Sequence, residues 1–231
     1  MTNQQLPVTE QQKDLGIIIT KYLKWQQQTE KSCKTDNRVL GFIASNFKYK
    51  KREMMLLLYK SLVRPHLEYA VQFWSPHLQR DIIKTEKIQR KASKIIPEII
   101  NHSYSQRLKD LNLISFEQRR LRGQLIEVFK YIGWFNNATA RGLFDRDFND
   151  RTRNNGEKFI VKRFNTSLAQ HFDPIKITTT WNALPSDIVS SRKVNTFKNR
   201  LDQHWEWIPQ VCEPPSNYDL HFKCNMQTNI L

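Results

Sequence analysis

One amphipathic stretch, RDIIKTEKIQRKASKII (residues 80–96), constrains the fold of this chain most strongly. At about 100° per residue, its apolar residues gather on one side of a helix and its lysines on the opposite side. The apolar side comprises Ile82, Ile88, Ala92, Ile95 and Ile96. The other side comprises Lys84, Lys87, Lys91 and Lys94, with Arg90 at its edge. We expect a helix that ends at Pro97, with one face in a core and the other facing solvent or a polyanion.

Helical periodicity begins near Lys31 and continues toward this stretch. In residues 33–47, Val39, Phe42 and Ile43 fall on one helical face, which predicts that they enter a core. Gly41 lies beside this face and would allow a neighbouring element to approach closely. These residues therefore predict a first long helix, with its apolar side buried.

The segment LYKSLVRPHLEYAVQFWSPH (residues 58–77) carries Pro65 in the middle of a helical pattern. Because proline lacks an amide donor, Pro65 must kink or break the helix. We place three residues at i, i+4 and i+8 in the core: Met54, Leu58 and Leu62. Four aromatic residues are candidates for stacking on bases: Tyr59, Tyr69, Phe73 and Trp74. Tyr69 and Phe73 share the helical face of Leu62, so the favoured interpretation for both is core.

Two more helices are predicted between residues 103 and 133. The first places three residues in phase: Tyr104, Leu108 and Leu111. Ser115 and Gln118 then form a capping-box pattern that opens the second helix, and Gly133 closes it. Its inward residues are Leu121, Leu125, Val128, Phe129 and Ile132. Three arginines cluster in its first two turns, where they oppose the helix dipole and indicate an external anion: Arg119, Arg120 and Arg122.

The C-terminal third is richer in loop and strand signals. Asn155-Gly156 within RTRNNGEKFIVK predicts a two-residue hairpin turn. Residues 177–185 are β-branched and then turn at Pro185, and a final helix follows, capped by Asn195. Its apolar side comprises Phe197, Leu201 and Trp205.

The predicted fold is mainly α: a helical bundle with a short N-terminal strand and a small α+β C-terminal region that contains a hairpin. The strand is Ile17–Ile19, after Gly16. We expect disorder over residues 1–13 and 209–231, a strand and linker over 14–30, helices over 31–133, and the α+β region over 134–208. No internal repeat is visible.

The charge balance indicates the class of partner. There are 37 Lys+Arg against 22 Asp+Glu, which gives a formal net charge of +15. Such an excess favours nucleic acid first and an anionic membrane surface second, although a merely soluble basic protein has the same composition. Cys33, Cys212 and Cys224 are too sparse for a disulfide framework. We expect an intracellular protein, nuclear or cytosolic, without a membrane span.

No catalytic constellation is visible. The chain has no phosphate-binding loop, dinucleotide fingerprint or metalloprotease motif, and no Asp-Asp pair that could begin a two-metal site. We therefore expect no catalytic residue and no cofactor. Four residues could in principle bind zinc, but their spacing is irregular, so no metal site is expected: His204, Cys212, His221 and Cys224.

Several segments resemble one known family when they are read in order: DLGIIITKYLKW, NRVLGFI, LYKSLVRPHLEYAVQFWSPH, DIIKTEKIQRKASKIIPE, RLKDLNLISFEQRRLRGQLIEVFK, RTRNNG, FNT and WNALP…NTFKNRLD. Together they resemble the C-terminal part of reverse transcriptases of non-LTR retrotransposons, of the jockey and chicken-repeat type. The resemblance covers roughly residues 14–205. It implies that the DLG strand is the edge of a palm, that residues 31–100 look like a thumb, and that the region beyond is the family's C-terminal segment.

The chain also departs from that family. The catalytic x-Asp-Asp turn and the rest of the palm would precede Asp14. Asp36 stands where the family has a small or apolar residue, and DPIKITTTWNALP replaces a more helical, Arg-containing version. The resemblance therefore implies a truncated relative of an RNA-directed DNA polymerase that has no polymerase activity alone.

Three functional hypotheses follow. The first is sequence-tolerant binding of RNA, DNA or an RNA–DNA hybrid through backbone phosphates. Its candidate residues are Lys60, Arg64, Lys84, Lys87, Arg90, Lys91, Lys94, Arg119, Arg120 and Arg122. The second is an interaction module that binds a palm in trans or associates with itself through exposed apolar residues. The residues considered for that surface are Met54, Met55, Leu57 and Trp74. The third is a relic without a function.

Overall fold

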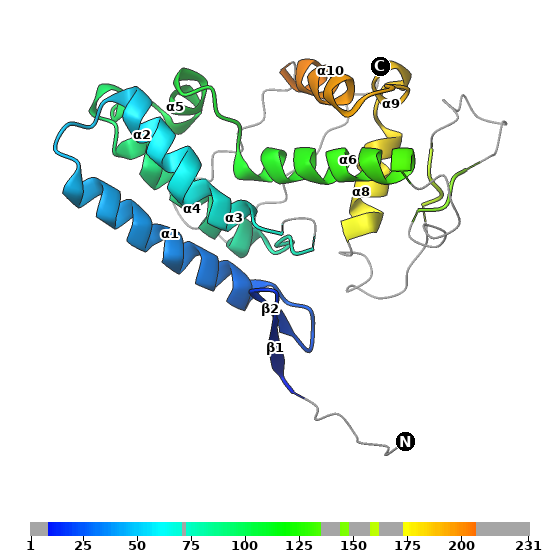
Figure 1. Cartoon of the computed structure of the whole chain (residues 1–231), viewed down its shortest axis with the longest axis horizontal. Coiled ribbons are helices and arrows are strands. Elements are labelled where there is room, and N and C mark those ends of the chain that lie inside the picture. The colour runs from blue at the N-terminus through cyan, green and yellow to red at the C-terminus, as the bar shows by residue number, and fades with distance from the viewer. Residues whose placement is uncertain (1–8, 71–72, 135–143, 148–157, 162–172, 207–231) are drawn as a thin grey trace.

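The structure, a computed structural model, describes residues 9–70, 73–134, 144–147, 158–161 and 173–206. It is mainly helical, as predicted, with a two-stranded sheet near the N-terminus (Figure 1). The N-terminal elements are β1 Gln11–Asp14, β2 Ile17–Thr20, α1 Gln26–Asn46, α2 Arg52–Leu58, the π-helical turn η1 Tyr59–Val63, and α3 Arg64–Glu68. The remaining elements are α4 Gln79–Lys94, the 3-10 turn η2 Pro97–Ile99, α5 Tyr104–Asp110, α6 Phe116–Trp134, α8 Asp173–Asn182, α9 Ser186–Val189 and α10 Val194–Glu206.

The N-terminal hairpin pairs β1 with β2 in antiparallel register. Leu15 and Gly16 both have positive φ, 44° and 84°, as a type I′ turn requires. Tyr69 donates a hydrogen bond to the Leu15 carbonyl at 2.9 Å, and the Lys31 ammonium donates to the Gly16 carbonyl. The predicted strand is thus β2. The expected disorder up to residue 13 is wrong for residues 11–13, which form β1.

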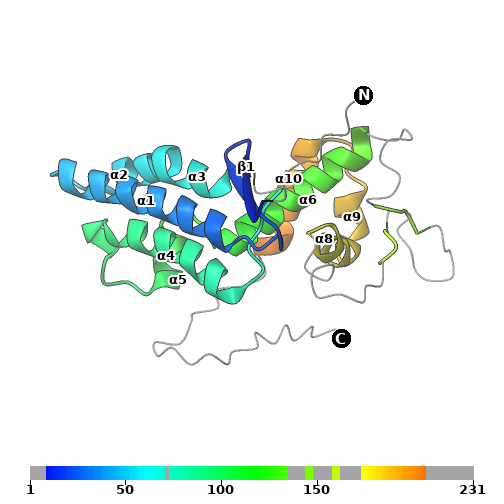
Figure 2. The same ribbon diagram turned by 90° about the horizontal axis from the view of Figure 1, so that it is seen from below.

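Helices α1 and α4 run parallel, side by side. Three side-chain pairs join them, each separated by 54 positions: Gln26 with Arg80, Glu30 with Lys84, and Asn37 with Lys91. A constant offset of this kind requires two helices that point the same way and advance at the same rate. The segment α2–η1–α3 carries the chain back beside them, packed on α1 and joined to α4 through Tyr59 and Gln89 (Figures 1 and 2).

The return segment buries a different set of residues from the predicted one. The buried residues are Met55, Tyr59, Val63 and Leu67. The first three each follow directly after a predicted core residue: Met54, Leu58 and Leu62. Leu62 is exposed, and Met54 and Leu58 are only partly buried. The run MMLLLY is apolar on every side, so periodicity alone did not define which side is buried.

Pro65 is accommodated by a local widening of the helix. The amide of Arg64 bonds to the Tyr59 carbonyl, five residues back, which closes the π-turn η1. Pro65 then lies in the first turn of α3, where its missing amide hydrogen leaves no bond unmade. The predicted kink is therefore a π-turn, and helical structure continues to Glu68.

Other core predictions need correction at exposed aromatic residues. Phe42, Tyr69 and Phe73 were expected to be buried, yet more than half of each side chain is exposed. The helix ends at Glu68, so helical phase no longer determines the directions of Tyr69 and Phe73. No atom approaches within 4 Å of the position that a Cβ on Gly41 would take, so the predicted close approach is absent.

A second core lies between α6, α8, α9 and α10. It is built around Leu125, Trp181, Phe197 and Leu201, each at most 1% exposed. The β-branched residues 177–180 are helical rather than extended, because α8 buries Ile177 and Trp181 against α6 and α10. The described part of the C-terminal region is accordingly more helical than the predicted α+β arrangement.

The predicted Asn155-Gly156 turn lies outside the described residues, but a strand contact beside it is described. Phe159 pairs with Arg146 in an isolated antiparallel bridge. A two-residue turn at Asn155-Gly156 would instead place Phe159 opposite Thr152. The described register is therefore not that of the predicted hairpin. The segments 1–8 and 209–231, predicted to be disordered, also lie outside the described residues.

Asp36 is a buried acid within the first core. Its side chain is fully buried between α1 and α3, with one carboxylate oxygen 3.1 Å from Nδ1 of His66 and the other without a partner among the described atoms. Burial raises the pKa of Asp36 from 3.8 to about 7, because desolvation penalises the charged form.

This pKa shift predicts the direction of the pH dependence of stability. Because the folded state holds the Asp36 proton more tightly than the unfolded state, the contribution of Asp36 is fully present below pH 3.8 and is lost as pH rises to about 7. Asp36→Asn, which mimics the neutral acid, should raise the free energy of unfolding at pH 8 by on the order of 2 kcal/mol and change it little at pH 4. Denaturant unfolding at both values measures this. Exposed Asp14→Asn is the matched control, and equal effects of the two changes would contradict the assignment.

Candidate nucleic-acid interface

The parallel pairing of α1 and α4 brings six basic side chains onto one surface, which we call the cationic face. It comprises Lys34 and Arg38 of α1 and Lys84, Lys87, Lys91 and Lys94 of α4. All are exposed except Lys84, which is partly buried. An open groove of about 550 Å³ follows the helix junction, lined by Glu30, Cys33, Lys34, Asn37, Arg38 and Lys84.

Two side-chain pairs bridge the groove and hold its lysines in place. Lys84 donates to Glu30 at 2.9 Å, and Lys91 donates to the Asn37 amide oxygen at 2.8 Å. The hydrogen bond from Lys84, assisted by one from Gln26, lowers the pKa of Glu30, and the same bond raises the pKa of Lys84. Both groups are therefore charged at neutral pH, and Glu30 offsets one lysine of the face.

The outer cations remain available for a ligand. Lys34, Arg38 and Lys94 have no hydrogen-bond or ion-pair partner among the described residues. Lys84 and Lys94 are ten residues apart, roughly 15 Å at 1.5 Å per residue. One nucleic-acid strand presents a phosphate about every 3.4 Å along a duplex axis, so this length corresponds to roughly four phosphates.

The α1 contribution was absent from the sequence-based candidates. Lys34 and Arg38 are four positions apart, which places them on one face of a helix. The helical periodicity that identified the α4 lysines would also have identified Lys34 and Arg38. What the sequence could not show was that α1 and α4 are neighbours and parallel.

Three other basic residues predicted to bind nucleic acid lie outside the cationic face. Arg90 stacks on Tyr104, with its guanidinium carbon 4.2 Å from the ring centroid. Lys60 belongs to η1 and is partly buried. Arg64 belongs to α3, where it pairs with Glu68 at 3.6 Å and burial lowers its pKa. None of the three joins the cationic face through a described contact.

The three arginines of α6 do not form the predicted second anion patch. Arg119 binds Glu68 of α3, and Arg122 makes two hydrogen bonds to Asp202 of α10, at 2.6 and 2.8 Å. Arg120 is 5% exposed, and its guanidinium lies 5.0 Å from the Trp74 ring centroid. Arg120 also donates to the Leu67 carbonyl of α3 at 3.4 Å. At 100° per residue the three positions point in different directions from α6, and their side chains attach the helix to α3, to Trp74 and to α10.

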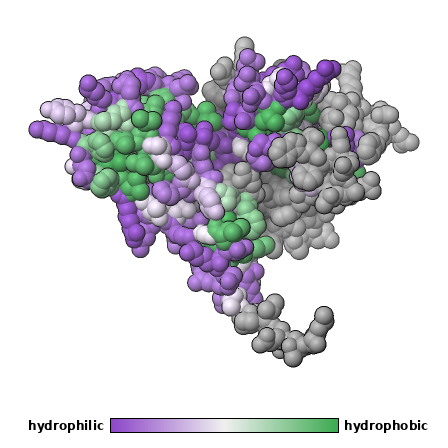
Figure 3. Space-filling view, in the orientation of Figure 1, coloured by the Kyte–Doolittle hydropathy of each residue, from purple (hydrophilic) through white to green (hydrophobic). Residues whose placement is uncertain are grey.

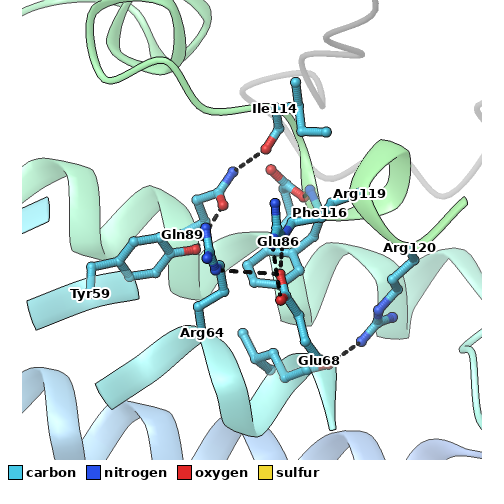
Figure 4. A network of polar contacts seen from close by, with 10 residues as sticks. Tyr59, Arg64, Glu68, Glu86, Gln89, Ile114, Phe116, Arg119 and Arg120 are labelled. Atoms are coloured by element: carbon cyan, nitrogen blue, oxygen red, sulfur yellow. Dashed lines mark hydrogen bonds and ion pairs between the residues drawn. The ribbon is translucent and has the colours of Figure 1, made fainter. Parts of the chain in front are cut away.

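A buried polar network fixes α4 against η1, α5 and α6 (Figure 4). Gln89 accepts a hydrogen bond from Tyr59 at 2.7 Å and donates to Tyr104 and to the Ile114 carbonyl. Glu86 accepts from Tyr104 and from the Phe116 amide at the start of α6. Desolvation raises the pKa of Glu86, and these two donors act in the opposite direction. The network positions α4 from the side opposite the cationic face.

The predicted capping box is confirmed at the start of α6. The Ser115 amide donates to the Gln118 side chain, and the Gln118 amide donates to the Ser115 hydroxyl. The predicted apolar side is likewise confirmed at Ile88 and Ala92 of α4 and at Ile96 just after it, each of which is buried, whereas Ile82 and Ile95 are only partly buried. The lysine side of the same helix is consequently turned outward.

Other kinds of site find little support in the described part of the chain. It contains no group of three His, Cys, Asp or Glu side chains arranged to hold a metal, and Cys212, His221 and Cys224 lie outside it. Burial raises the pKa of Cys33 to about 11, so its thiol is protonated at neutral pH. No described helix is long and apolar enough to span a bilayer. No protein-family model, curated protein or solved structure matches the chain.

The ion pair between Arg122 and Asp202 predicts a structural role for this arginine. In a double-mutant cycle of Arg122→Gln and Asp202→Asn, thermal unfolding should reveal a coupling of about 0.5–1 kcal/mol, because the pair is only partly buried. Arg122→Gln should leave affinity for a polyanion unchanged. If Arg122→Gln lowered affinity as much as Lys94→Gln and showed no coupling to Asp202, Arg122 would instead belong to the binding surface.

Proposed function

We propose that the protein binds nucleic acid in a sequence-tolerant manner, with the cationic face contacting backbone phosphates. The observation that carries this proposal is the parallel pairing of α1 and α4. Three cations, Lys34, Arg38 and Lys84, line a groove with one carboxylate, and the other three lysines of the cationic face follow along α4. Ammonium groups bind phosphate as point charges and have no fixed geometry for base edges. The face therefore suits a strand backbone rather than a particular sequence.

We propose further that the chain is the thumb-like part of a protein related to non-LTR retrotransposon reverse transcriptases. The support for this is the ordered series of sequence segments between residues 14 and 205. An RNA–DNA hybrid is then the natural test ligand. Two-metal catalysis needs converging acidic residues, and the described residues offer no such group, so any polymerase activity would require a palm outside this segment.

A second candidate function is association with another protein or with a second copy. Phe42, Leu57 and Leu62 are exposed on α1, α2 and η1, and Figure 3 shows a hydrophobic area over α1 and α2. Of the apolar residues expected to be uncovered, Leu57 is exposed, whereas Met55 and Trp74 are buried. Self-association in size-exclusion chromatography that Leu57→Lys abolishes, without any binding of nucleic acid, would favour this second function.

Neutralising the cationic face should weaken binding and reduce its salt dependence. For the triple variant Lys87→Glu, Lys91→Glu and Lys94→Glu, we expect affinity for an RNA–DNA hybrid to fall at least tenfold in 50 mM salt. The slope of log affinity against log salt should decrease in magnitude by about 2–3, roughly one for each lost phosphate contact. Fluorescence anisotropy at several salt concentrations measures both quantities.

The control variant must make the same change in net charge elsewhere. Lys48, Lys109 and Lys193 are exposed and lie outside α1 and α4. Their combined replacement by Glu changes the charge by the same amount and should lower affinity much less. A flat salt response of the natural chain, or equal losses in the two triple variants, would refute the proposed surface.

Removing the carboxylate of Glu30 should have the opposite effect. Glu30→Gln removes the shorter of the two ion pairs of Lys84, at 2.9 Å, and leaves the one with Asp81 at 3.6 Å, while keeping the size of the side chain at position 30. Affinity for the hybrid should rise about two- to fivefold at low salt, because one more cation faces the ligand. Unchanged or reduced affinity in the same titration would show that the groove does not contact phosphate.

A further inference from the structure

An exposed aromatic pair lies at the N-terminal end of α1. Phe73, which follows α3, packs edge-on against Trp25, with ring centroids 6.0 Å apart. Phe73 remains 55% exposed and Trp25 is partly exposed. Covering the exposed apolar area of Phe73 with a ligand would be favourable, because transfer of apolar surface out of water lowers the free energy.

The aromatic pair is linked to the start of the cationic face through neighbouring residues. Trp25 directly precedes Gln26, whose side chain accepts a hydrogen bond from Arg80 in the first turn of α4. The next pair along the helices is Glu30 with Lys84, at the start of the face. A strand whose phosphates follow the cationic face would therefore reach the aromatic pair as it passes Arg80.

Phe73 is held outward by its neighbour. The amides of Phe73 and Trp74 both donate to the Ala70 carbonyl, at 2.9 and 3.1 Å. Trp74 is completely buried, and its indole nitrogen donates to the Tyr69 carbonyl at 2.8 Å. With Trp74 fixed inside, Phe73 is preorganised on the surface, which lowers the entropy cost of binding a ligand to it.

We propose that Phe73, supported by Trp25, stacks on an unpaired base of the strand whose phosphates contact the cationic face. This proposal rests on the proposed function and names a residue that adds single-strand preference to it. Aromatic faces bind any base, because every base has a π-face, and the adjacent cations hold the backbone. Charge favours this ligand over a protein partner, since Arg80 is bonded to Gln26, the residue after Trp25, in a chain of net charge +15.

The test compares two ligands that differ only in an unpaired extension. One is a blunt 20-base-pair RNA–DNA hybrid, and the other carries a four-nucleotide extension, tested on each strand end. The natural chain should prefer one extended ligand. Phe73→Ala should lower affinity for that ligand about five- to a hundredfold, leave the blunt ligand unchanged and keep the salt slope, because stacking releases no counterions.

Two further variants separate stacking from other effects. Phe73→Trp should keep the preference for the extension, whereas Tyr49→Ala, at another exposed aromatic position, should change nothing. A 2-aminopurine in the extension should lose fluorescence on binding the natural chain and regain it with Phe73→Ala. Thermal unfolding should be unchanged in Tyr49→Ala and should shift only slightly in the two Phe73 variants, because Phe73 loses or changes a single edge-on contact with Trp25.

The inference and the proposed function fail in different ways. Lysine-dependent binding with equal effects of Phe73→Ala on both ligands would overturn the stacking role and leave the cationic face intact. Loss of self-association in Phe73→Ala, with affinity for both ligands unchanged, would assign the pair to a protein contact instead. No binding of either ligand by the natural chain would overturn both proposals.

Discussion

The parallel packing of α1 on α4 is the constraint on which the rest of the structure depends. Glu30 with Lys84 and Asn37 with Lys91 keep the two helices in register, and buried residues beneath them, such as Leu40 and Ile88, supply the apolar contact. Parallel neighbours need a return segment, which α2, η1 and α3 provide. Two rows of cations then lie side by side, which neither helix could achieve alone.

The return segment must pack beside two helices whose spacing is already set. Val63 and Leu67 are completely buried on either side of Pro65, so the helix could not break there without uncovering one of them. The π-turn η1 satisfies both requirements, since it relieves the clash that proline makes with the carbonyl four residues back while helical structure continues. After Glu68 the chain leaves the helix, buries Trp74 and turns Phe73 outward.

The sequence predicted those features that local physics determines. The two faces of α4 and the capping box at Ser115 and Gln118 followed from periodicity and from hydrogen bonds between near neighbours. The choice between Met54 and Met55 as core did not, because the surrounding run is apolar on every side. Likewise, residues 177–180 favour strands intrinsically, yet burial against α6 and α10 makes them helical.

Only part of the candidate site could be predicted from the sequence, because local periodicity does not show which helices pack together. The α4 lysines formed a face by themselves, whereas Lys34 and Arg38 join them only through tertiary packing. The arginines of α6 were close in sequence but point to different sides of their helix. Buried Arg120 and the Arg122–Asp202 pair show that a basic cluster is an anion site only where its members share a surface.

Lysine footprinting of the bound complex tests the cationic face most directly. Acetylation followed by mass spectrometry reports the reactivity of every lysine in a single sample, with and without an RNA–DNA hybrid. The account predicts that Lys34, Lys87, Lys91 and Lys94 become protected together, while exposed lysines on other elements keep their reactivity. Uniform protection of all lysines, or protection confined to elements other than α1 and α4, would contradict it.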